Sequence, residues 1–160
     1  EEEGLETMKN GLMGFGAIGS IAVYPLFQGL LAEAMCKLNL FDQALVNVDE
    51  AIKMAKANNE RASEIDLYRI KGKILMDSAK GDITEAEGYI RQSIELAEKL
   101  GSKSRKLQAV LDLVKFNQSG NNDDLIKLLS NTCSAFNEGK NTPDYLEAQK
   151  ILNKDILQVT

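Results

Sequence analysis

The chain contains no histidine, the side chain that most often serves as a general base or a metal ligand. Ser-His and Cys-His nucleophile pairs are therefore excluded. Neighbouring carboxylates could still perform acid–base chemistry, and they occur as Asp49 with Glu50, Glu85 with Glu87, and Asp123 with Asp124. Each pair falls on a helical pattern, where solvation and favourable charge near a helix N-terminus account for acidic residues. The sequence assigns no catalytic residue, and we expect a protein that is not an enzyme.

A glycine-rich segment, GFGAIG, spans residues 14–19 and fits the dinucleotide-binding spacing G-x-G-x-x-G. That motif binds a pyrophosphate only where a strand precedes it and a helix N-terminus follows it. Here the helical pattern LETMKNGLM precedes the glycines, and the helix that follows must accommodate Pro25. We therefore expect a loose connection between repeats, and no cofactor.

The two cysteines, Cys36 and Cys133, lie far apart and have no paired-ligand spacing. Both fall in apolar helical patterns, where a free cysteine behaves as a small hydrophobic residue. We expect buried thiols, without a disulfide or a metal site.

Charge and hydropathy narrow the classes of partner. The net charge of −5 opposes nucleic-acid binding, which depends mainly on Lys and Arg. No apolar run is long enough to span a membrane, and the acidic start EEEGLE is unlike the basic start of a signal peptide. We expect a cytoplasmic protein that binds neither nucleic acid nor membrane.

One helical pattern recurs four times. The segment from Phe41 aligns with the segment from Ile83 at a shift of 42 residues, and further copies lie 40 residues before the first and 39 residues after the second. A small residue is followed by a large one four positions on, and by a small and a large one at seven and eight, which is one face of an α-helix. The copies are Gly4, Met8, Gly11 and Leu12; Ala44, Val48, Ala51 and Ile52; Ala86, Ile90, Ser93 and Ile94; and Leu125, Leu129, Thr132 and Cys133. Except at Leu125, the small residues predict close approach of a partner helix.

Further helices are expected between these copies, at roughly 21–38, 62–79, 104–118 and 143–157. Polar links with Asn39, Gly81-Asp82, Gly120 and Thr142-Pro143 supply the stop and start signals. The expected fold is an all-α, right-handed α-solenoid of tetratricopeptide-like antiparallel helix pairs, forming one domain over 1–160. Its expected parts are 1–18, the second helix of a truncated repeat; three repeats at 21–58, 62–100 and 103–138; and a capping helix at 143–157.

The period near 41 exceeds the standard tetratricopeptide length of about 34 residues, and HEAT-like pairs have a similar length. Leu31-Ala32 with Met35, followed by the Ala44 copy, is the tetratricopeptide order of large and small residues. The chain starts without Met on the second half of a motif, so we expect a fragment of a larger protein.

Four segments carry a family resemblance: PLFQGLLAEAMCKLNLFDQALVNVDEAI, EIDLYRIKGKILM, GDITEAEGYIRQSIELAEKLGSKSRKLQAVLDL and EGKNTPDYLEAQKIL. Together they cover about two thirds of the chain. They resemble the long-helix tetratricopeptide region at the C-terminus of bacterial multidomain signalling proteins. Those proteins join a nucleotide cyclase or a DNA-binding output domain to a STAND-type NTPase. The resemblance implies a regulatory module, and it leaves the output domain open.

The first helix of each pair is expected to line the concave side of such a solenoid. Its groove-facing positions are Glu33, Lys37, Asp66, Arg69, Lys73, Gln108, Leu111 and Lys115. Four of these residues, Lys37, Arg69, Lys73 and Lys115, could form a basic stripe that binds an acidic peptide or chain terminus. Alternatively, the charged side chains only solvate the groove.

Two functions remain open at this stage. The first is a protein–protein interaction module that binds a protein, a peptide, other domains of its parent chain, or a second copy of itself. The second is an autoinhibitory solenoid that senses a small ligand, which a deep, convergent polar pocket would favour.

Overall fold

The computed structural model of the chain describes residues 2–17, 23–78, 81–117 and 123–158. These residues form eight α-helices and no strand, which confirms the all-α prediction. The helices are Glu2–Ala17 (α1), Tyr24–Lys37 (α2), Phe41–Ala57 (α3), Arg61–Asp77 (α4), Ile83–Lys99 (α5), Lys103–Phe116 (α6), Asp123–Ser134 (α7) and Pro143–Gln158 (α8). The predicted ends at 21, 79 and 118 lie outside the described residues.

Three helices end in the same way, with one residue in the left-handed region. Asn39, Asn59 and Gly101 have φ values of 59°, 57° and 65°. In each case the next amide donates back to a carbonyl five residues earlier, as in the bond from Leu40 N to Met35 O at 3.0 Å. This is the Schellman arrangement, for which Gly and Asn are the favoured residues. It produces the short turns that bring consecutive helices side by side.

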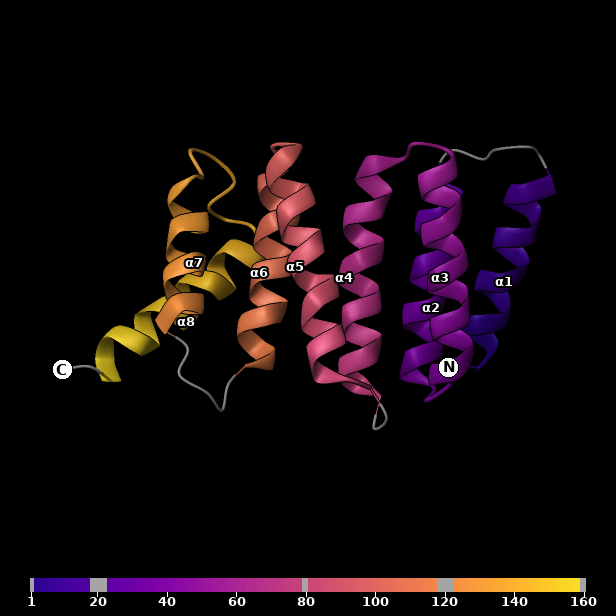
Figure 1. The fold of residues 1–160 in the computed structure, drawn as a ribbon, viewed down its shortest axis with the longest axis horizontal. Coiled ribbons are helices and arrows are strands. Elements are labelled where there is room, and N and C mark those ends of the chain that lie inside the picture. Colours follow the sequence, from indigo (N-terminus) through magenta and orange to yellow (C-terminus); the bar gives the residue numbers. More distant parts are fainter. Residues whose placement is uncertain (1, 18–22, 79–80, 118–122, 159–160) are drawn as a thin grey trace.

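Consecutive helices pack against each other along the whole series, from α1 to α8. Figure 1 shows them as a stack, with α1 at one end and α8 running obliquely at the other. In addition, α2 contacts α4, α4 contacts α6, and α6 contacts α8, whereas α3, α5 and α7 do not contact one another within the described residues. We call α2, α4, α6 and α8 the first-helix row. The sequential packing is consistent with a helical repeat.

The recurring pattern faces the core where a helix has neighbours on both sides. In α3 and α5 all four pattern positions are buried, including Ala44, Ala51 and Ala86, each with 0% exposure. In α7, Leu129, Thr132 and Cys133 are buried and Leu125 is half-buried.

The pattern in α1 behaves differently. Gly4, Met8 and Gly11 are exposed and Leu12 is half-buried, because α1 contacts only α2. Leu5 is the one buried side chain of this helix. The pattern therefore predicted the buried face of α3 and α5 correctly. The close approach predicted at Gly4 and Gly11 of α1 is wrong, because nothing lies within 4 Å of a Cβ atom built on either glycine.

α4 and α5 approach each other closely. A Cβ atom built on Gly72 would lie 2.5 Å from Ile90 Cγ1 and 2.9 Å from the backbone oxygen of Ala86. Ser93 Oγ donates to the backbone oxygen of Ile65 at 2.7 Å across the same interface. Small residues at these positions let the two helices touch almost backbone to backbone.

Candidate binding surface

All six residues predicted to bind a partner lie on the first-helix row. Glu33 and Lys37 lie on α2, Asp66, Arg69 and Lys73 lie on α4, and Lys115 lies on α6. Lys37 and Lys115 are exposed, and the other four are half-buried. Of the remaining groove-facing positions, Gln108 donates to Asp144 of α8 at 2.9 Å. Leu111 is only 2% exposed, so its predicted place on the groove surface is wrong.

Ion pairs connect each helix of the row to the next. Lys73 of α4 pairs with Glu33 of α2. Arg69 and Asp66 of α4 pair with α6 through Asp112, at 2.7 Å, and Arg105, at 2.9 Å. Lys115 of α6 then pairs with Glu147 of α8 at 2.8 Å. We call this set the cross-row ion pairs.

These pairs change the electrostatic character expected of the surface. Three of the four cations of the predicted basic stripe are neutralised by carboxylates, and only Lys37 has no ion pair among the described residues. Burial alone would raise the pKa of Glu33, but the hydrogen bond from Lys73 and the nearby positive charges outweigh burial and lower it. The row is thus a zwitterionic surface. Whether it binds an acidic partner remains a prediction.

The partner residues Arg105, Asp112 and Glu147 were not identified from the sequence. The available signal was a pair of opposite charges separated by about one repeat, as in Asp66 with Arg105. That signal becomes specific only when the register of one helix against the next is known.

A buried lysine, Lys71, was also missed. Its Nζ donates to Asp49 Oδ1 at 2.6 Å and to the hydroxyl oxygen of Tyr89 at 2.9 Å, and lies 4.2 Å from the centre of the Tyr89 ring. Burial would lower the pKa of Lys71, but these two hydrogen bonds outweigh it and raise the pKa. A lysine held in its charged form is a bridge between α3, α4 and α5 and is poorly suited to act as a base.

Both cysteines are free and buried, as predicted. Burial, followed by the negative charge of Asp77, raises the pKa of Cys36 to about 11, and burial raises the pKa of Cys133. Such thiols are poor nucleophiles. Within the described part of the chain, no group of three or more metal-ligating side chains could hold an ion.

The glycine-rich segment begins inside a helix. Residues 14–17 form the last turn of α1, so the prediction of a loose connection is wrong for them, while 18 and 19 lie outside the described residues. The α-helix continues through Gly14 and Gly16. A helix, and not a strand, therefore leads into the segment.

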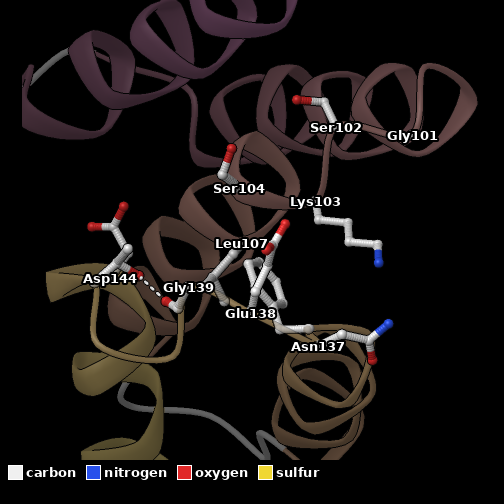
Figure 2. A pocket seen from close by; sticks show the side chains of 11 residues that line it. Gly101, Ser102, Lys103, Ser104, Leu107, Asn137, Glu138, Gly139 and Asp144 are labelled. Atoms are coloured by element: carbon white, nitrogen blue, oxygen red, sulfur yellow. Dashed lines mark hydrogen bonds between the residues drawn. The ribbon is translucent and has the colours of Figure 1, made fainter.

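A hollow of about 690 Å³ lies between the start of α6 and the loop that joins α7 to α8. Figure 2 shows Ser102, Lys103 and Ser104 on one wall and Asn137, Glu138 and Gly139 on the other. Lys103 Nζ already donates to the backbone oxygen of Ala135 at 2.7 Å. The hollow lies on the loop edge of the stack, and no residue of the cross-row ion pairs lines it.

No protein-family model and no curated protein sequence matches the chain. The described helices include none that is long and apolar enough to cross a bilayer. The described residues therefore show an all-helical protein whose helices pack in sequential pairs.

Proposed function

We propose that this chain is a non-catalytic protein–protein interaction and regulatory module. It forms a right-handed solenoid of tetratricopeptide-like helix pairs within a larger bacterial signalling protein, either a nucleotide cyclase or a transcriptional regulator. The observation that carries the proposal is the first-helix row, in which four helices from successive pairs lie side by side and present one extended surface. The four-fold helical pattern and the family resemblance support the same function.

The row favours a partner that is a protein segment with acidic side chains. Lys37 has no ion pair among the described residues, and the Lys115 side chain is 42% exposed although it is paired. An acidic peptide can pair with Lys37 and Lys115 without breaking the half-buried ion pairs of Arg69 and Lys73. Because exposed charges are screened by ions, the affinity should fall as salt rises.

A displayed library of random acidic peptides tests this function with the intact chain. Clones selected on the wild-type protein are remeasured on Lys37→Glu and Lys115→Glu variants. The matched control is Lys53→Glu, a charge reversal at an exposed position of α3, outside the row. Reversal of Arg69 or Lys73 is unsuitable, because it would also break the cross-row ion pairs.

We expect selected peptides to bind at least about tenfold more weakly to the Lys37 and Lys115 variants and unchanged to the Lys53 control. Binding should weaken further between low and moderate ionic strength. Failure to select any peptide, or equal loss of affinity in all three variants, would contradict the function assigned to the row.

A further inference from the structure

An apolar groove runs along the seam between α1 and α2, at one end of the stack. It consists of two hollows, of about 260 Å³ and 390 Å³, which share Met8. From α1 it is lined by residues at helical spacing, namely Gly4, Met8, Gly11 and Phe15. The other side is lined by Phe27, Leu30 and Ala34 of α2 and by Leu38, which directly follows α2. The spacing of three, four and seven residues places each set on one face of its helix. The groove is therefore continuous along about three helical turns.

Large apolar side chains in this groove are open to solvent. Phe27 is 43% exposed, Met8 is 39% exposed and Leu30 is 38% exposed. Phe15 and Phe27 meet edge to face with ring centres 5.4 Å apart and close one end of the seam. Lys37 lies at the other end. A cluster of exposed apolar residues of this kind is typical of an interaction site.

The internal repeat shows what covers such a groove elsewhere in the molecule. At a shift of 40 residues, Met8 corresponds to Val48, Phe27 to Leu67 and Leu30 to Ile70. Those counterparts are 0%, 0% and 1% exposed. They lie on the seam between α3 and α4, and α2 packs against both of these helices.

The contact that fills the covered seam is specific. A Cβ atom built on Gly29 of α2 would lie 2.4 Å from Leu67 Cδ2 and 3.4 Å from Ile70 Cδ1. A residue without a side chain thus lets α2 settle between the large residues of α4. The open groove presents Phe27 in the position of Leu67, so it requires an equally small residue from whatever covers it.

We propose that the groove between α1 and α2 binds a partner α-helix with the chemistry of α2, that is, an apolar face with a small residue at its centre. The helix would be about three turns long, and an acidic residue at one end would match Lys37. The groove shares only Lys37 with the predicted binding residues of the first-helix row. This inference can therefore be tested independently of the proposed function.

A labelled synthetic peptide of residues 24–37, with serine in place of Cys36, serves as the probe for fluorescence anisotropy with the full chain. The groove variant is Leu30→Glu, and the matched control is Val46→Glu, which alters an exposed apolar residue of α3 that does not line the groove. A second peptide carries Gly29→Leu, and a third has a scrambled order.

We expect saturable binding of the first peptide to the wild-type chain. Its affinity should fall at least about tenfold with Leu30→Glu and stay within about twofold with Val46→Glu. The Gly29→Leu and scrambled peptides should also bind at least about tenfold more weakly.

Three results would overturn the proposal. The first is absence of binding to the wild-type chain. The second is binding that Leu30→Glu leaves unchanged, because the peptide would then be replacing the protein's own α2 on the intact seam between α3 and α4. The third is self-association of the wild-type chain that Leu30→Glu abolishes, because a second copy would then occupy the groove.

Discussion

At the scale of single residues, two helical glycines occupy opposite environments. Gly72 of α4 lies against the backbone oxygen of Ala86 and the side chain of Ile90, whereas nothing lies within 4 Å of a Cβ atom built on Gly88 of α5. Alanine is the better helix former by about 1 kcal/mol at either position. Contact with the neighbouring helix therefore determines whether a Gly→Ala substitution raises or lowers the free energy of unfolding.

We expect Gly72→Ala to lower the free energy of unfolding by about 1 to 2 kcal/mol, because α4 and α5 must separate to admit the methyl group. The matched variant Gly88→Ala should instead raise it by up to about 1 kcal/mol. Urea unfolding of both variants measures the two changes. Changes of the same sign would show that the contact between α4 and α5 is looser than described.

The thiol of Cys36 gives a second prediction at this scale. With its pKa raised to about 11 by burial and by Asp77, about one hundredth of the usual thiolate is present at pH 8. Asp77→Asn removes the negative neighbour, so alkylation of Cys36 by iodoacetamide should become faster. Mass spectrometry can follow Cys36 and Cys133 separately, and Cys133 serves as the internal control. An unchanged Cys36 rate would mean that burial alone raises its pKa.

At the scale of helices, the cross-row ion pairs join α2 to α4, α4 to α6 and α6 to α8. The pKa of Glu33 is lower in the folded chain than its ordinary value of 4.5. The Glu33–Lys73 pair therefore adds stability above about pH 4.5, and this contribution is lost as the pH falls through the folded pKa.

Glu33→Gln should lower the free energy of unfolding at pH 7 by up to about 1 kcal/mol, since the pair is only partly buried. The difference from the wild-type chain should shrink as the pH falls below 4.5 and through the lowered folded pKa of Glu33, because protonation then removes the charge in both folded and unfolded states. Denaturant unfolding over a series of pH values below 7 tests this, with the exposed Glu95→Gln as control. A difference that persists at low pH would show that Glu33 acts through packing and not through charge.

Much of the helical framework was predictable because its determinants are local. Ala44 and Ala86 recur with large residues at helical spacing, and Asn39 and Asp82 mark helix boundaries next to them. Asp82 indeed caps α5 by accepting from Thr84 N at 2.8 Å. These features depend on residues within one or two turns of each other.

The surface was less predictable because its determinants are distant in sequence. The positions of Arg69 and Lys73 on the first-helix row were anticipated, but their neutralisation by Asp112 and Glu33 depends on how one helix is offset against the next. The same offset buries Leu111. No pattern within a single helix contains that information.

At the scale of the whole molecule, burial is concentrated in the middle of the stack. Ten residues of α4 are buried, against one in α1. A helix with a single neighbour and one buried side chain opens more easily than one packed on all sides.

We expect amide hydrogens of α4 and α5 to exchange slowest and those of α1 to exchange fastest among the described helices, by at least about a hundredfold. Hydrogen exchange followed by mass spectrometry of peptic fragments measures this order. If the peptide of residues 24–37 binds the α1–α2 groove as proposed, its addition should slow exchange in α1 without changing α4. Equal protection of α1 and α4 would contradict the uneven burial.

The charges of the first-helix row also make the helix pairs non-interchangeable. Glu33, Lys73, Lys115 and Glu147 follow one another along α2, α4, α6 and α8, and each lysine is neutralised by a carboxylate of a terminal member of the row. A gene duplication that inserted a second copy of the middle pair would place one Lys73 beside another. Like charges would then meet without a carboxylate between them. The row thus favours its own order and length over rearranged or domain-swapped arrays, even though the second helices α1, α3, α5 and α7 share one apolar pattern.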